Sequence, residues 1–239
     1  MIGCAASNRK LRRPPRLIIP DQKPVTSDPN DDFLPAASAD GRSIVFHSNR
    51  SGTYHVWRMN LDGSNPVQLT NGKTREAFFP PVVRPDGRWV IYSNEDGLWK
   101  ISIDGGSPER VTDHLGYGKA ISPDGQRIAY LAYEREGGRV LEVMSFAGGA
   151  PINTLELPPT ASARDFQFSG DGKSVLFLDS RNGTSNIWSL PLDGSQPKQV
   201  TNFKANQIFD FAFSRDGKQL AFTRGETASD VVMIAGFKK

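Results

Sequence analysis

Ser122-Pro123-Asp124-Gly125-Gln126-Arg127-Ile128-Ala129-Tyr130 is the stretch that decides the fold, because its pattern returns along the whole chain. In each copy, an aliphatic residue follows four positions after the aspartate of an Asp-Gly pair, and an aromatic residue follows six positions after it. The aspartates are Asp40, Asp86, Asp124, Asp171 and Asp216, and the aromatic residues are Phe46, Tyr92, Tyr130, Phe177 and Phe222. Self-similarity at intervals of roughly 40–50 residues indicates a propeller or another repeat array.

Each repeat also carries the signals of four short strands. Asp-Gly between β-rich runs is a strong hairpin signal, because glycine tolerates positive φ and aspartate tolerates the left-handed region. In the first repeat two such turns and one loop separate the runs 33–38, 43–46, 54–59 and 67–70. Four antiparallel strands per repeat predict an all-β fold, a β-propeller built from four-stranded blades.

The repeats predict a single propeller domain over residues 16–239, after a disordered basic lead-in at residues 1–15. The fifth repeat has no fourth strand of its own, and residues 16–26 are similar to the end of a repeat. We therefore predict five blades, with the N-terminal strand 16–26 closing the last blade, because closure removes exposed strand edges. The alternative is an open part of a larger ring whose earlier blades are missing. The repeats cover about 33–70, 78–112, 117–158, 164–201 and 208–237.

The positive charge of the chain is concentrated in its lead-in. The formal net charge is +3, but residues 1–16 contain five basic side chains and no acidic one. The folded part is therefore close to neutral, which argues against a nucleic-acid-binding face. No apolar run reaches the roughly 18–20 residues of a membrane span. The single cysteine, Cys4, excludes a disulfide within the chain.

Motifs of catalysis and cofactor binding are missing from the sequence. The three histidines, His47, His55 and His114, do not have the spacing of metal ligands. There is no G-x-S-x-G nucleophile turn, no phosphate-binding or dinucleotide glycine motif, and no protein-kinase motif. The sequence therefore predicts no catalytic residue, no metal and no cofactor.

Several of these segments resemble a known family. The stretch 122–130, the segment 46–52, and the runs 187–190 and 192–201 are similar to the WD40-like repeat of TolB-type β-propellers. The last segment, 214–234, also resembles the C-terminal end of propellers in bacterial serine/threonine kinases and winged-helix transcription regulators. This resemblance implies a sensory or interaction module whose effector domain lies N-terminal to it, and it is compatible with either the periplasm or the cytoplasm.

The order of strands predicts which face of the propeller binds. The turns between the first and second strands, and between the third and fourth, lie on one face of the disc and are nearly constant in length. The other connections lie on the opposite face, which we call the variable face, and differ between repeats, as at 48–53, 94–97, 132–139 and 180–185. Because recognition usually depends on loops that differ on a rigid scaffold, we predict binding at the variable face and the mouth of the central channel.

Five residues are candidates for binding on the variable face. Asp165 and Asp210 occupy equivalent positions six residues before their Asp-Gly pairs, and two carboxylates beside a channel could hold a cation or a basic group. The alternative is that each caps nearby backbone or pairs with a neighbouring basic residue. Arg50, Arg181 and Arg224 recur in the loops after the second strands and could contact an acidic partner; the alternative is pairing across blades.

Three functions remain open on this sequence. The first is a non-catalytic interaction or ligand-sensing module, part of a larger bacterial regulatory protein, with a protein, a peptide or a small ligand as its partner. The second is the substrate-gating propeller of a prolyl-oligopeptidase-like hydrolase whose catalytic domain lies outside this chain. The third is a propeller lyase with a metal in its channel, which the histidine inventory disfavours.

Overall fold

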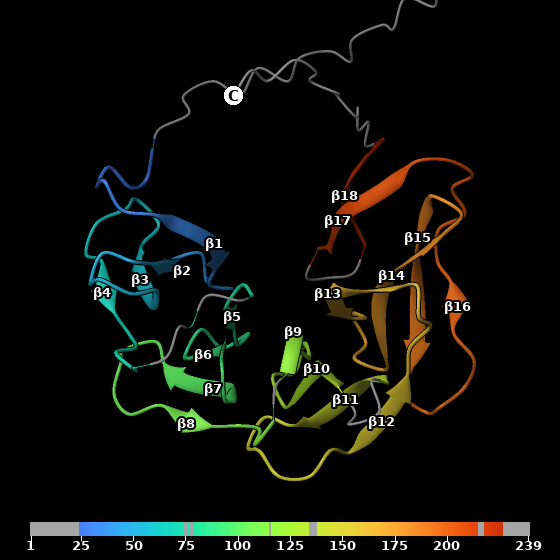
Figure 1. Ribbon diagram of the computed structural model, residues 1–239, viewed down its shortest axis with the longest axis horizontal. Helices are drawn as coiled ribbons and strands as arrows, with labels where there is room; N and C mark the ends of the chain where they lie inside the picture. Colours follow the sequence, from blue (N-terminus) through green and yellow to red (C-terminus); the bar gives the residue numbers. More distant parts are fainter. Residues whose placement is uncertain are drawn as a thin grey trace, which may run out of the picture.

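The computed structural model describes residues 24–73, 76, 79–114, 116–133, 138–214 and 218–226, with the backbone alone at 133 and 163–165. Five antiparallel sheets follow one another around a central hub (Figure 1). In each four-stranded sheet the strands are paired in the order of the sequence. The predicted all-β propeller of four-stranded blades is therefore confirmed. The described residues contain no helix that is long and apolar enough to cross a membrane.

Four blades are complete in the described residues, and two strands of a fifth are present. The first blade comprises β1 (Asp32–Ala37), β2 (Ser43–Ser48), β3 (His55–Asn60) and β4 (Val67–Gln68), and the second β5 (Val82–Val83), β6 (Trp89–Asn94), β7 (Gly97–Ser102) and β8 (Glu109–Arg110). The third comprises β9 (Gly116–Ile121), β10 (Arg127–Tyr133), β11 (Arg139–Ser145) and β12 (Asn153–Glu156). The fourth comprises β13 (Ala161–Phe168), β14 (Ser174–Arg181), β15 (Thr184–Pro191) and β16 (Lys198–Gln199), and the fifth β17 (Gln207–Phe213) and β18 (Leu220–Gly225).

The predicted closure of the ring falls mostly outside the described residues. Residues 1–23 and 227–239, which include the lead-in, most of the expected closing strand and the expected third strand of the fifth blade, are not among them. The described end of the closing segment, residues 24–26, forms no strand. There the carbonyl oxygen of Val25 lies directly against Gly63, in the turn between β3 and β4 of the first blade.

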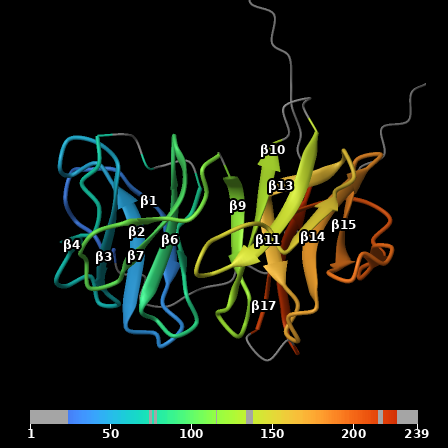
Figure 2. The ribbon, with the colours of Figure 1, turned by 90° about the horizontal axis from the view of Figure 1, so that it is seen from below.

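The innermost strands β1, β5, β9, β13 and β17 contact one another in succession around the hub. In the side view, the strands run between the two faces of the disc (Figure 2). The start of each innermost strand therefore lies at the variable face, and its end at the face of the Asp-Gly turns.

We call the five aromatic residues that follow six positions after an Asp-Gly aspartate the aromatic column. Four of them lie in the core of the blades. Phe46, Tyr92, Tyr130 and Phe177 are at most 2% exposed. The fifth member differs: Phe222 is 41% exposed and packs beside the ring of Phe203, at 5.4 Å between centroids. The column is thus buried in the four complete blades, and its fifth member lies in the two-stranded sheet of β17 and β18.

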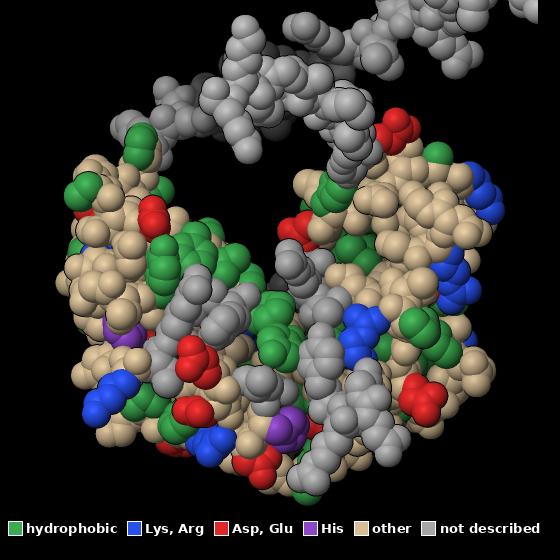
Figure 3. Space-filling view, in the orientation of Figure 1, with side chains coloured by type: hydrophobic (Ala, Val, Ile, Leu, Met, Phe, Trp, Pro, Cys, Tyr) green, Lys and Arg blue, Asp and Glu red, His purple; other side chains and the backbone are tan. Residues whose placement is uncertain are grey.

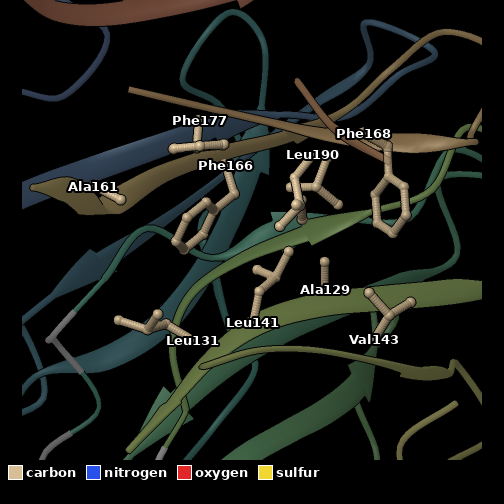
Figure 4. Close-up of a cluster of buried hydrophobic side chains, with 11 residues drawn as sticks. Ala129, Leu131, Leu141, Val143, Ala161, Phe166, Phe168, Phe177 and Leu190 are labelled. Atoms are coloured by element: carbon tan, nitrogen blue, oxygen red, sulfur yellow. The ribbon is translucent and has the colours of Figure 1, made fainter. Parts of the chain in front are cut away.

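Hydrophobic packing joins neighbouring blades to one another. Between the third and fourth blades, Leu131 and Leu141 face Phe166 and Phe177 in one buried cluster (Figure 4). The third-strand tryptophans Trp99 and Trp188 pack against clusters that combine side chains of two blades. Because each sheet buries its faces against adjacent sheets, the stack forms a continuous core.

The Asp-Gly turns are explained by local hydrogen bonds. In the Ser122-Pro123-Asp124-Gly125 turn, Ser122 Oγ donates to Asp124 Oδ1 at 2.5 Å and accepts from the Arg127 N–H at 2.9 Å. The Asp124 carboxylate also accepts the Gln126 N–H, at 2.9 Å. The hydrogen bond from Ser122 is the main reason that the pKa of Asp124 lies below its usual value. The same arrangement recurs at Ser38-Asp40 and Ser169-Asp171.

Arginine side chains then tie these turns together from blade to blade. Arg84 Nε donates to the carbonyl oxygen of Gly125 in the third blade at 2.9 Å. One blade further on, Arg127 Nη2 donates to the carbonyl oxygen of Gly172 at 2.9 Å. The face that carries the Asp-Gly turns is thus held by structural contacts.

Candidate binding site at the mouth of the hub

An aromatic residue stands at or just before the start of four of the five innermost strands. Phe33, Phe79, Tyr117 and Phe209 each lie seven residues before the aspartate of their repeat's Asp-Gly pair. We call these four residues the mouth aromatics. On the variable face, which Figure 3 shows, hydrophobic side chains gather around the central hollow.

Three of the mouth aromatics pack against other rings, and the fourth is exposed to solvent. Phe79 and Tyr117, from adjacent blades, meet edge to face with centroids 5.2 Å apart. Phe33 stacks on His47 at 5.8 Å and meets Tyr54 edge to face at 5.0 Å. Phe209 is 49% exposed, so it presents the largest open aromatic surface of the set. Aromatic side chains that are rigid and partly exposed are typical anchors of protein interfaces.

The backbone departs from regular strand geometry in four of the five innermost strands. The pairing of the innermost strand with its neighbour is irregular in β1, β9, β13 and β17, always in the part near the variable face. Leu34, next to Phe33, has a φ of 54°, and Gly118, next to Tyr117, has a φ of 50°. A leucine in the left-handed region is strained, and bulges of this kind re-aim side chains near functional sites.

A layer of buried polar groups lies beneath the mouth aromatics. His47 Nε2 donates to the carbonyl oxygen of Phe79 across 3.2 Å, and Lys119 Nζ donates to Ser93 Oγ across 3.0 Å. Burial lowers the pKa of Lys119 to about 7. Burial, with a smaller contribution from the nearby Lys119, lowers the pKa of His47 to about 4. His47 is therefore neutral at pH 7, and these contacts connect the first three blades under the mouth.

The structure places the two predicted aspartates on adjacent innermost strands. Asp165 lies on β13 and Asp210 on β17, and these two strands contact each other. The side chain of Asp165 is outside the description. Asp210 is exposed, and its Oδ1 accepts the N–H of Phe211 at 2.7 Å, which is the backbone cap expected as the alternative. Whether the two carboxylates share a ligand stays a prediction.

The three predicted arginines each cover an aromatic ring. The guanidinium of Arg50 lies 5.0 Å from the centre of Trp57, that of Arg181 4.9 Å from Trp188, and that of Arg224 4.3 Å from Phe203.

Their polar partners come from the same blade or the segment leading into it. None of the contacts that the structure describes for them is the pairing across blades given as the alternative. Arg50 Nη2 binds both carboxylate oxygens of Asp32 at 2.9 Å, and Arg181 Nε binds Asp179 Oδ2 at 2.7 Å. Arg224 Nη2 donates to the carbonyl oxygen of Ala205 at 2.6 Å. The side chain of Arg50 is 14% exposed and serves to stabilise the first blade, whereas the side chain of Arg181 is 58% exposed.

A second polar cluster lies beside the loop between β2 and β3. Thr53 Oγ1 is 2.8 Å from His55 Nε2, and His55 Nδ1 is 3.3 Å from Glu76 Oε2. Hydroxyl, imidazole and carboxylate follow one another in the order used by acyl-transfer enzymes. The hydroxyl of Thr70 also donates to Glu76 and accepts the N–H of Val56, so the carboxylate is anchored to β3. Burial raises the pKa of Glu76, which disfavours the ionised form that such a catalytic chain requires. We therefore assign this cluster to the attachment of residue 76 to the first blade.

Metal binding has no support in the part of the chain that the structure describes. There, no three His, Cys, Asp or Glu side chains come together in a way that could hold a metal ion. The histidines are found in other roles: His47 under the mouth, His55 beside Glu76, and His114 between two carboxylates.

The mouth aromatics were not among the residues predicted from the sequence, although their signal is present there. The repeat signature lies on residues that follow the Asp-Gly pair, and the only candidates predicted before the pair were Asp165 and Asp210, six residues upstream. The position seven residues before the pair is aromatic in four repeats and holds Arg164 in the fourth repeat. The irregular pairing near the starts of β1, β9 and β17 could not be read from composition or periodicity.

Comparisons with known proteins place this architecture among TolB-like propellers. The Tol-Pal system protein TolB of Francisella tularensis is 25% identical over 214 residues, which cover 84% of this chain and 48% of that protein. An uncharacterized protein of Agrobacterium fabrum is 31% identical over 106 residues, 41% of this chain and 35% of the relative. A solved structure from Agrobacterium tumefaciens that carries a TolB assignment shares the fold with a TM-score of 0.68 and 22% identity, and the match covers 84% of this chain and 73% of the other.

These matches confirm the TolB-like resemblance and give no support to the narrower resemblance to kinase and winged-helix propellers. The chain spans between a third and a half of the length of the curated relatives described above. One family model matches more than half of the sequence, over residues 12–135, and it describes the N-terminal region of dipeptidyl peptidase IV. This chain, a TolB-like β-propeller, therefore belongs to the dipeptidyl peptidase IV N-terminal region family.

Proposed function

We propose that this chain is a non-catalytic interaction module that binds a protein or peptide segment at the mouth of its hub, as part of a larger bacterial protein. The observation that carries the proposal is the set of mouth aromatics, with Phe209 half exposed at the start of β17. Burying one such ring against a partner supplies a large apolar contact at low conformational cost, which is how interface anchors act.

Two further features support the variable face as the binding face. The opposite face is occupied by turns whose polar groups are satisfied locally and between blades, as at Ser122 and Arg84. Asp210 is exposed beside Phe209 and adds a negative charge to the mouth. The best-fitting partner is therefore an extended segment that combines an apolar side chain with a basic one.

The proposal is tested by selecting peptides that bind the purified protein and measuring their affinities for two variants. Phe209→Ala removes a half-exposed ring at the mouth. Leu61→Ala is the matched control, because Leu61 is 54% exposed but lies in the turn between β3 and β4, on the opposite face. We expect Phe209→Ala to weaken binding by about tenfold or more, which corresponds to about 1.4 kcal/mol. Peptides whose affinity depends on Leu61 and not on Phe209 would refute the proposed site.

A second function is favoured by the family match. The dipeptidyl peptidase IV N-terminal region gives its name to the matching family model, so a propeller that admits substrates to a hydrolase is the alternative. To distinguish the two, the native protein is isolated from its source with an antibody against this propeller and treated with a fluorophosphonate that labels active-site serines. Labelling of a polypeptide that contains this chain supports the hydrolase; absence of labelling, with peptide binding at the mouth, supports the interaction module.

A further inference from the structure

Among the described residues two lysine side chains are buried, and they differ in their partners. Lys100 is 8% exposed, and its Nζ lies 3.1 Å from the carboxylate of Glu109 and 3.3 Å from the carbonyl oxygen of Phe146. The same ammonium lies 5.6 Å from the ring centre of Trp89 and 5.2 Å from that of Phe146. The charge of Lys100 is therefore compensated by an anion, a carbonyl dipole and two aromatic rings.

Lys119, on β9, lacks this compensation. It is 7% exposed, and its Nζ donates to Ser93 Oγ at 3.0 Å. None of the ion pairs formed within the described residues includes it. An ammonium has three N–H donors, and a neutral hydroxyl satisfies one of them without supplying a negative charge. A buried cation of this kind is costly unless an anion pairs with it.

A second buried polar group near Lys119 also lacks a partner. His47 is 0% exposed, and its Nε2 donates to the carbonyl oxygen of Phe79, so its Nδ1 carries a lone pair. No hydrogen-bond donor of the described residues reaches this Nδ1. The charge of Lys119 contributes to the lowered pKa of His47, which shows that the two groups interact. Buried polar groups without partners are rare in native proteins, and an unmodelled ligand is one explanation for them.

Both groups lie one layer below the mouth aromatics. Phe79 carries the carbonyl group that His47 binds, and Tyr117 precedes Lys119 by two residues, about 6 Å along β9. The rings of Phe79 and Tyr117 meet each other at the hollow of the variable face (Figure 3). A side chain or chain end that enters between these rings therefore approaches the ammonium of Lys119.

We infer that the mouth of the hub binds its peptide partner through a carboxylate, which pairs with the ammonium of Lys119. This inference rests on the proposed function and adds an anionic group to the apolar and basic side chains of the partner. A carboxylate supplies the missing negative charge and accepts charge-assisted hydrogen bonds, which are stronger than neutral ones. An N–H of the same segment satisfies Nδ1 of His47. Asp210, which lies on β17 two blades further on, remains available for the basic side chain.

The test uses peptides that are selected on the purified protein and that need Phe209 for binding. Each peptide is synthesised again with one carboxylate at a time converted to an amide, either in an acidic side chain or at the C-terminus. Affinities are measured by calorimetry at pH 6, below the pKa of Lys119, so that the ammonium is charged. We expect one of these conversions to weaken binding by about tenfold or more. Its position identifies the source of the carboxylate, an acidic side chain or the chain end.

Two variants connect this preference to Lys119. In Lys119→Met the acid and amide forms of the peptide should bind equally well. Lys100→Met is the matched control, because it makes the same change at a buried lysine that is already paired, and it should preserve the preference for the acid form. The Tm of Lys119→Met should equal or exceed that of the unaltered protein, because methionine removes an uncompensated buried charge. Loss of an ion pair within the protein would instead lower the Tm.

The possible failures are distinguishable. Peptides that need Phe209 but bind equally well as acid and amide would overturn this inference and leave the proposed function intact. A preference for the acid form that survives in Lys119→Met, or a Tm of that variant well below that of the unaltered protein, would also overturn it. If no selected peptide needs Phe209, the proposed function itself is refuted.

Discussion

Replacing Ser122 by alanine should destabilise the protein by about 2 kcal/mol, because its hydroxyl performs two tasks in a buried turn. Ser122 is 0% exposed, donates to Asp124 Oδ1 and accepts the N–H of Arg127. The alanine variant leaves that N–H without its acceptor, and an unsatisfied buried donor costs about 1–3 kcal/mol. The carboxylate of Asp124 keeps its other hydrogen bond, from the N–H of Gln126.

The assay is equilibrium unfolding in urea, with thermal unfolding as a second readout. A loss of 2 kcal/mol lowers the Tm by about 4–8 °C for a protein of this size. Ser64→Ala is the matched control: Ser64 Oγ donates to Asp62 Oδ1 at 2.6 Å in an exposed turn, and no buried backbone N–H depends on it. The control should change stability by less than about 0.5 kcal/mol. Equal effects of the two substitutions would refute the argument, since they would show that the shared contact to aspartate, and not the buried acceptor, determines stability.

Three further outcomes follow from the contacts described above. The pKa of His47 is about 4 in the folded protein instead of the usual 6.5. The free energy of unfolding should therefore fall by up to about 3 kcal/mol as the pH falls from 6.5 to 4. Urea unfolding across this pH range should show a smaller fall for His47→Gln. Arg50→Ala should lower the unfolding free energy by about 2 kcal/mol, because it leaves the nearly buried Asp32 without its charged partner; a loss of peptide binding with unchanged Tm would instead identify Arg50 as a ligand contact. Thr53→Val should leave the hydrolysis of p-nitrophenyl acetate by the protein unchanged, because the chain from Thr53 through His55 to Glu76 is assigned to structure; a rate that falls to the background in Thr53→Val would contradict this assignment.

The fold could be predicted from the sequence because its signals are local and repeated. The Asp-Gly turn and the aromatic residue six positions later, as in Asp124 and Tyr130, report a hairpin and a buried face within a few residues of each other. Five copies of the same signal leave little choice of architecture. The fifth copy illustrates the limit, because Phe222 carries the pattern but is 41% exposed, and burial depends on neighbouring strands that a local pattern does not report.

The site was only partly predictable, because it depends on how strands from different blades meet. Strand order alone identified the variable face. The role of Arg50 was not visible, since the partner carboxylate of Asp32 lies on another strand and reaches it only after the blade forms. The pairing of His114 with Glu142 likewise brings together residues 28 positions apart on two blades. Motif spacing, which treats each histidine within its own segment, could not detect such contacts.

The claim that the mouth of the hub is the binding site is tested most directly by site-specific photo-cross-linking in the cells that produce the protein. Benzoylphenylalanine is introduced at position 209 in one variant and at position 61 in another, both of which are about half exposed. The account predicts a discrete cross-linked partner from position 209 that is absent from position 61. A partner that cross-links from position 61 and not from position 209 would show that the protein binds through its opposite face.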